Sequence, residues 1–183
     1  MTDKDDSRVR AARTKRIISI SVMLATAIAI LAMFADGIYA QKERKLAERI
    51  NENAQRMVDE GRQTFRFDTF GDEAFWSGSL KLHQAIAGSM FGGVGPGVSP
   101  KTALAVGLKV DVDALPKPLE KALRKGQVNL DDPASTLALL KANAVVGVIG
   151  NFNQDGNLSS MGISCAFCHS TVDDSFAPGI GHR

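Results

Sequence analysis

Two thiols and an imidazole lie within five residues of each other near the end of the chain, in the sequence Cys165-Ala166-Phe167-Cys168-His169. This is the C-x-x-C-H spacing at which haem is attached covalently to protein. Thiols one helical turn apart can each add to one vinyl group of a haem, and the imidazole that follows can bind the iron. The chain has no other cysteine. The motif therefore predicts one covalent haem c held by Cys165 and Cys168, with His169 as the proximal iron ligand.

The C-x-x-C part of the motif also occurs in other kinds of site. A thioredoxin-like redox pair needs a βαβ context, which the pattern of apolar residues does not indicate. A zinc site needs further cysteines or histidines nearby, and only His83 and His182 remain in the chain. A simple disulfide between Cys165 and Cys168 is the main alternative, because the chain carries the features of an exported protein.

The first forty residues have the layout of an export segment. A stretch rich in Lys and Arg ends at Arg16, and an apolar run follows over residues 17–35. This run is longer than the ~7–15 residues of an ordinary signal-peptide core and approaches the ~20 residues that span a bilayer. We expect residues 1–40 to be either a signal peptide cleaved after Ala40 or an uncleaved N-terminal membrane anchor. In both cases the basic flank stays in the cytoplasm and the rest of the chain lies outside.

The chain carries 22 Lys and Arg against 20 Asp and Glu, and the excess belongs to the N-terminal segment. Residues 41–183 contain 16 charges of each sign. The part of the chain beyond the export segment therefore has no basic cluster that would follow a phosphate backbone, and we expect no nucleic-acid partner.

The rest of the chain is expected to be mainly α-helical. The spacing of apolar residues predicts a helical stalk over residues 41–62 and a helical domain of unknown role over residues 63–156. Within and after these regions the expected helices are 72–87, 100–107, 116–125, 133–144 and 159–167, and the expected extended segments are 65–70 and 110–113. The helix over residues 159–167 is the one expected to carry the haem cysteines.

Short polar patterns predict several local features. Ser99 is an expected N-cap, because it precedes a proline at the first helical position, and either Asp131 or Asp132 is the expected N-cap of the helix that begins at Pro133. The carboxylates of Asp111 and Asp113 are expected to be exposed on a short strand. Residues 151–157 place oxygen side chains as an EF-hand does, but Gly162 occupies the position of its bidentate Glu. We therefore expect an ordinary Asn/Asp/Gly turn there rather than a calcium site.

The C-x-x-C-H motif and the later Ala177-Pro178-Gly179-Ile180-Gly181 turn together resemble the monohaem c-type cytochromes over about residues 157–183. In that family the motif lies on a helix, and a proline carbonyl in the following turn often accepts a hydrogen bond from the proximal histidine. Pro178 occupies the matching place. The resemblance implies a protein on the periplasmic side of the bacterial cytoplasmic membrane, anchored or secreted, that passes single electrons between redox partner proteins.

The family's sixth iron ligand, a methionine well downstream of the motif, has no counterpart, because Met161 is the last methionine. Three accounts of this difference stay open. The chain is an N-terminal fragment of a longer cytochrome, with an incomplete haem domain over residues 157–183. Or it is complete and resembles the cytochrome c′ type. Or the iron takes an upstream ligand, for which His83 and Met90 are candidates. Met161 is expected on the motif's own helix and unable to reach the open face of the iron.

Two other functions are consistent with the motif. The sequence Ile-Ser-Cys-x-x-Cys-His resembles dihaem peroxidases and oxidases, which would make the chain part of a haem enzyme. Alternatively, residues 62–150 form a partner-docking module with the haem as an appendage. The favoured prediction is a non-catalytic electron carrier. An apolar stripe with Trp76, Leu80 and His83 is the upstream feature that could cover the iron, although ordinary core packing is the expected role of Trp76.

Overall fold

A computed structural model describes residues 3–183, except for the side chains of residues 3–12, 14, 17, 32, 34–38 and 40. The chain divides into two units, Met1–Met57 and Val58–Arg183. Helices make up most of the regular structure, so the chain is mainly α, as the sequence predicts. The strands are short and all lie in the second unit.

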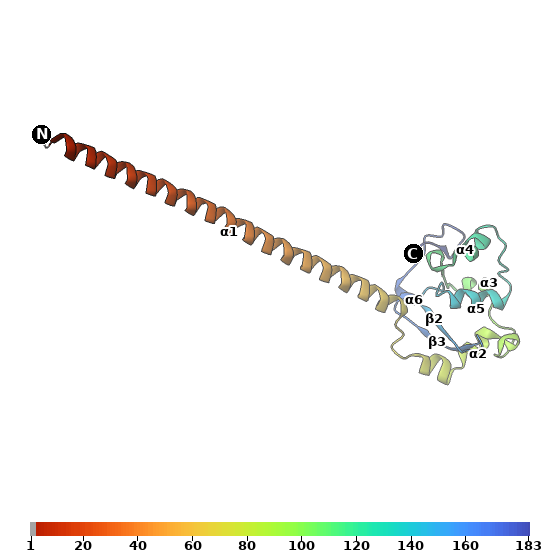
Figure 1. Ribbon diagram of the computed structural model, residues 1–183. Coiled ribbons are helices and arrows are strands. Elements are labelled where there is room, and N and C mark those ends of the chain that lie inside the picture. The colour runs from red at the N-terminus through yellow and green to blue at the C-terminus, as the bar shows by residue number, and fades with distance from the viewer. Residues whose placement is uncertain (1–2) are drawn as a thin grey trace. The chain divides into compact units, whose positions relative to one another are not determined.

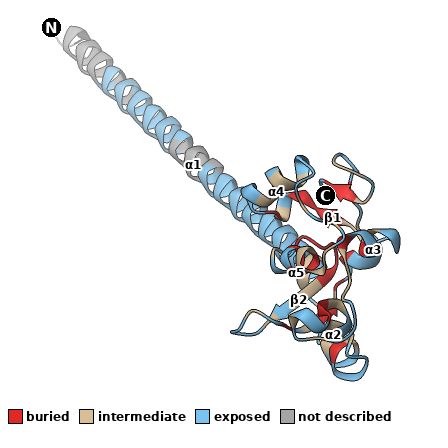
Figure 2. Ribbon diagram, turned by 90° about the vertical axis from the view of Figure 1, so that its right-hand side faces the viewer, coloured by how far each residue is buried: buried red, intermediate tan, exposed pale blue. Residues whose placement is uncertain are grey.

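The first unit consists of a single helix, and this helix continues into the start of the second unit. α1 runs from Asp3 to Phe67 (Figure 1), and its described side chains are exposed through residue 65 (Figure 2). The predictions that the stalk helix ends at residue 62 and that the chain is extended from residue 65 were wrong, because α1 continues through Gly61 to Phe67. A single glycine inside a helix costs only about 1 kcal/mol relative to alanine, too little to end a helix flanked by good helix formers.

Among the helices that the structure describes, none contains a stretch long and apolar enough to cross a membrane. Part of the predicted export segment, including the side chains of residues 34–38, lies outside the described residues.

The second unit contains short helices around two small sheets. In chain order its elements after α1 are a π-helical turn η1 (Ala74–Ser79), α2 (Leu82–Ala87), η2 (Ser89–Phe91), α3 (Pro100–Ala105), β1 (Val110–Asp111), η3 (Val112–Ala114), α4 (Lys117–Arg124), α5 (Pro133–Lys141), β2 (Val148–Phe152), β3 (Leu158–Ile163), α6 (Ala166–His169) and β4 (Ile180–Gly181). β2 and β3 form an antiparallel hairpin, while β1 and β4 pair in parallel, with Val110 beside Ile180.

The core of the second unit lies between α5 and the hairpin (Figures 1 and 2). Leu139 and Leu140 of α5 are buried in one cluster with Val148, Leu158 and Met161 of the two strands. α2 and η1 also contact β3. The hairpin therefore packs against three elements that all precede it in the sequence.

The predicted helix start at Ser99 is confirmed, and of the two predicted caps Asp131 and Asp132 the structure shows Asp132. Ser99 Oγ accepts a hydrogen bond from the backbone N–H of Thr102 at 3.2 Å, and Asp132 Oδ1 accepts one from the N–H of Ala134 at 2.9 Å. The helices that follow begin at the predicted prolines and end two to three residues earlier than predicted. The expected turn is confirmed at residues 153–157, which connect β2 to β3, while residues 151 and 152 belong to β2.

Three other local predictions were wrong. The expected helix over residues 72–87 is broken into η1 and α2 around Lys81, whose φ of 55° is left-handed. The expected helix over residues 159–167 is β3 followed by the single turn of α6, because the Asn/Gly turn before it folds the chain back onto β2. Asp111 is buried rather than exposed, with its Oδ2 3.9 Å from a guanidinium nitrogen of Arg183.

Candidate functional site

The C-x-x-C-H motif occupies a single helical turn. Cys165 precedes α6, and Cys168 and His169 lie in it. The backbone N–H of His169 donates to the carbonyl of Cys165 at 3.2 Å, which closes the turn. All three side chains are exposed, and the two thiols are not joined to each other. Both thiols and the imidazole are thus available for chemistry on one short turn.

Buried neighbours anchor this turn to the rest of the unit. Ala166 is fully buried in a small cluster with Val146 and Val172. Just before the motif, the N–H of Ser164 donates to the carbonyl of Gly147 at 3.0 Å, and its hydroxyl donates to the carbonyl of Arg66 at 2.8 Å. The position of the motif is therefore set by the loop before β2 and by the end of α1.

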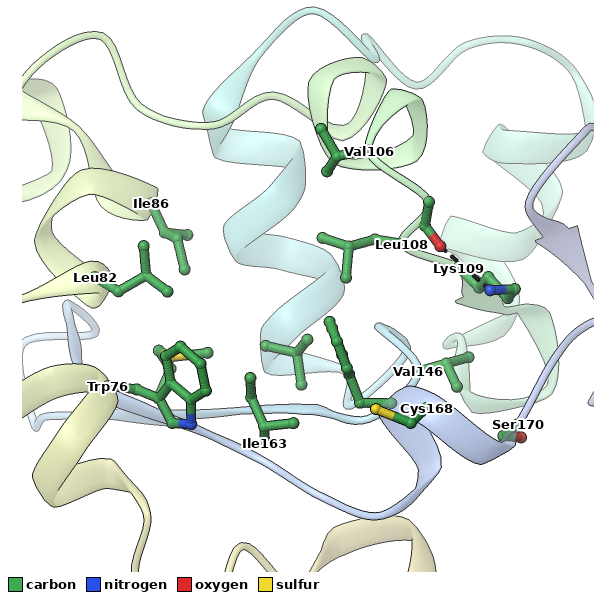
Figure 3. Close-up of a pocket in the computed structure, with 14 residues that line it drawn as sticks. Trp76, Leu82, Ile86, Val106, Leu108, Lys109, Val146, Ile163, Cys168 and Ser170 are labelled. Carbon is green, nitrogen blue, oxygen red and sulfur yellow. Dashed lines mark hydrogen bonds between the residues drawn. The ribbon is translucent and has the colours of Figure 1, made fainter. Parts of the chain in front are cut away.

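A cavity of about 640 Å³ lies beside α6, and Cys168 is part of its wall. Figure 3 shows Trp76, Leu82 and Ile86 on one side of this space and Cys168 and Val146 on another. The wall is mostly apolar and also includes Val106, Gly107, Leu108, Lys109, Val148, Met161, Ile163, Phe167 and Ser170. A cavity of this size is within the ~300–1,000 Å³ range of small-molecule and cofactor sites.

Two polar side chains from the η1 region hold one wall of the cavity. The carboxylate of Asp72 accepts hydrogen bonds from the indole N–H of Trp76 at 2.8 Å and from the backbone N–H of Ile163 at 3.0 Å. The hydroxyl of Ser77 bonds to both backbone groups of Met161. These contacts join Trp76 to β3, so the indole is fixed against the strand that leads to the motif.

The structure places the residues predicted to hold the haem in different surroundings. Cys168 lines the cavity, while Cys165 and His169 lie on the same turn outside its wall. The sixth-ligand candidates His83 and Met90 are not in the wall, and Met90 is 88% exposed. Nδ1 of His83 is buried and has no hydrogen-bond partner among the described residues. Burial lowers the pKa of His83, and the nearby Lys81 lowers it further.

Met161 is the residue that sequence reasoning misplaced. It was expected on the motif's own helix, but it lies on β3, is 2% exposed and forms part of the cavity wall. Of the predicted apolar stripe, only Trp76 lines the cavity. The break at Lys81 removes the continuous helix on which that stripe was predicted. The Asn/Gly turn before β3 is the sequence signal for a hairpin that would have placed Met161 correctly.

Charged groups follow the paired strands β1 and β4 along the chain. Nδ1 of His182 is 2.8 Å from Oδ1 of Asp113, and this hydrogen bond raises the pKa of His182. Nε of Arg183 donates to Oγ of Ser170, a cavity residue, at 3.0 Å. Pro178 is exposed in the turn before β4.

The two thiols and the imidazole of the motif suit a metal that is carried by an organic cofactor, rather than a metal ion bound by the protein alone. Among the described residues, no three His, Cys, Asp or Glu side chains come close enough together to hold a metal ion alone. The motif offers one imidazole and two thiols at the thioether spacing, beside an apolar cavity. This arrangement can attach a large, flat, mainly apolar cofactor through sulfur and give its metal one nitrogen ligand.

No protein-family model matches the chain, and no curated protein or solved structure matches it either. The function is therefore argued from the site itself.

Proposed function

We propose that this chain is an exported c-type haem protein, membrane-anchored or secreted, that carries single electrons between redox partner proteins. The observation that carries the proposal is the C-x-x-C-H turn with two free thiols, one of which forms part of the wall of an apolar cavity. Each of these features also occurs by itself in proteins that hold no haem. Their combination is what covalent attachment of a haem requires.

The residues of the chain would have distinct roles. Cys165 and Cys168 would form the two thioethers, and His169 would supply the proximal nitrogen. When bound, the haem supplies one-electron redox chemistry. The apolar wall with Trp76 would exclude water from one part of the cofactor, and burial of this kind tunes a reduction potential.

The proposed location is the periplasmic side of a bacterial cytoplasmic membrane. It is supported by the basic stretch that ends at Arg16 and the apolar run over residues 17–35. Alkaline phosphatase fused after Gln63 tests the orientation, because this enzyme is active only outside the cytoplasm. An inactive fusion in a bacterial host would contradict it, and fractionation would distinguish an anchor from a cleaved signal.

Covalent attachment is tested by producing the full chain together with a cytochrome c maturation system and staining for haem after denaturation. The wild type should keep its haem through denaturation and acid–acetone extraction. Cys165→Ser and Cys168→Ser should each retain one thioether at most, and the double variant should retain none. Extraction of all haem from the wild type, or titration of two free thiols in it, would contradict the proposal.

A haem enzyme of the peroxidase or oxidase type is the second candidate. It is favoured by the absence of His83 and Met90 from the cavity wall, because an iron with a free coordination position can react with peroxide. Turnover of peroxide by the haem-loaded chain, with a reduced redox protein as electron donor, would favour this function over electron carriage.

A further inference from the structure

A second, smaller cavity lies behind one wall of the large one. Its volume is about 50 Å³, and its lining comes from α2, α3, β1, α5 and β2. Ile86, Leu108, Lys109 and Val148 belong to the walls of both cavities, and Figure 3 shows the first three where they face the larger space. The two spaces are therefore separated by no more than a layer of side chains.

The small cavity is almost entirely apolar. Buried aliphatic side chains, including Ala103, Leu139 and Val145, form most of its wall. The ammonium group of Lys109 donates to the carbonyl of Gly107 at 3.2 Å. Thr136 also belongs to the wall, and its Oγ1 is buried with no hydrogen-bond partner among the described residues.

Size and polarity together restrict what can occupy this cavity. A cavity of only ~10–15 Å³ can hold a water molecule, but the water needs two to four polar partners to be stable there. The single hydroxyl of Thr136 supplies one. An organic ring is too large, since benzene occupies engineered apolar cavities of about 150 Å³. A completely empty space would deprive the surrounding side chains of dispersion contacts.

We propose that this cavity is a docking site for one diatomic gas molecule, such as dioxygen, which exchanges with the larger cavity past Leu108 and Ile86. An apolar diatomic fits the volume, needs no hydrogen bonds and can accept a weak one from Thr136. The inference rests on the two cavities and not on the haem, so it stands or falls separately from the proposed function.

The test is methyl NMR of the full chain under xenon pressure, with dissolved dioxygen as the second probe. Xenon should produce saturable shifts in the methyl signals of Leu139 and Val145, and paramagnetic dioxygen should broaden the same signals selectively. Ala103→Leu, which fills the cavity, should abolish both effects. Ala114→Leu adds the same volume at a partly buried core position outside the cavity wall, and it should leave both effects unchanged.

Thr136→Val keeps the shape of the side chain and provides a test that does not depend on Ala103→Leu folding. Xenon binding should persist in it, because a gas does not require the hydroxyl. Non-saturable shifts spread over the whole core, or the same shifts in a folded Ala103→Leu protein, would overturn the proposal. So would a long-lived water detected beside Thr136 that excludes xenon and is lost in Thr136→Val.

Discussion

The hydroxyl of Ser77 hydrogen-bonds to both backbone polar groups of Met161, across 84 residues of sequence. Ser77 Oγ donates to the carbonyl of Met161 at 3.1 Å and accepts from its N–H at 2.7 Å, and Ser77 is only 5% exposed. A sheet edge normally leaves such groups unpaired. Here one side chain satisfies the pair that a third strand would otherwise have satisfied, and it thereby fixes η1 with Trp76 against the cavity wall.

Ser77→Ala is expected to destabilise the protein by about 1–3 kcal/mol, because it leaves a buried N–H and a buried carbonyl without a partner. Ser159→Ala is the matched control, since Ser159 is exposed and bonds to the carbonyl of Asn151 in the same hairpin. Its effect should stay within about 0.5 kcal/mol. Urea unfolding followed by circular dichroism measures the loss of stability in both variants. Equal losses in Ser77→Ala and Ser159→Ala would contradict a special role for Ser77.

The local features that could be predicted from the sequence are those decided within a few residues. Ser99 and Asp132 cap helices because their side chains reach N–H groups two or three residues ahead. The C-x-x-C-H motif can be recognised from its own five residues. The turn over residues 151–157 was also predictable from its Asn, Asp and Gly content.

The predictions failed where distant partners decide the structure. Residues 159–163 carry a pattern compatible with a helix, and pairing with β2 together with Ser77 makes them a strand. The cavity cannot be predicted from one sequence, because its walls come from η1, α2, β2, β3 and α6, whose packing no local pattern specifies. The placement of Met161 in the wall and of Met90 in solvent follows from that packing.

Gly147 is expected to be essential for the position of the haem motif. It has a φ of 73°, and a Cβ added there would overlap the backbone N and Cα of Phe167 in α6. Gly147→Ala should therefore displace α6 and lower the ratio of covalently attached haem to protein. The clash adds to a backbone cost of about 1–2 kcal/mol for a left-handed alanine.

Gly126 provides the matched control. Its φ is 65°, and a Cβ there would meet no atom within 4 Å. Gly126→Ala has the same backbone cost without a clash, so its haem content should equal that of the wild type at temperatures where circular dichroism shows both to be folded. Equal haem loading in the two variants would mean that α6 does not depend on close approach at Gly147.

His182 and His83 are expected to affect stability in opposite directions as pH changes. The hydrogen bond to Asp113, aided by the charge of Asp173 and opposed by desolvation and by Arg124, raises the pKa of His182. The folded protein therefore binds this proton more tightly than the unfolded chain does. The resulting stabilisation is complete below the ordinary pKa of about 6.5 and is lost as pH rises through the higher folded pKa.

The pKa of His83 is lowered, chiefly by burial. Its protonation therefore opposes folding, and stability should fall as pH decreases below about 6.5 towards the lower folded pKa. Urea unfolding between about pH 5 and pH 8 measures the free energy of unfolding of each variant. Compared with the wild type, His182→Gln should lose less stability as pH rises, and His83→Gln should lose less stability as pH falls. Asp113→Asn should reproduce the effect of His182→Gln and add nothing to it in the double variant. Additive effects would show that the pair does not act as a unit.

Met161 is expected to influence the haem more than either upstream ligand candidate. It is a buried thioether in the cavity wall that also contains Cys168, while Met90 is 88% exposed and His83 lies outside that wall. In the haem-loaded chain, Met161→Leu should change the optical spectrum and the reduction potential, because both respond to the groups around the iron. Met90→Leu removes the same thioether from an exposed site and should change neither, and His83→Gln should also leave the spectrum unchanged. Loss of a low-spin spectrum in Met90→Leu or His83→Gln would instead identify that residue as the sixth ligand, and it would require the α2–η2 region to rearrange when haem is attached.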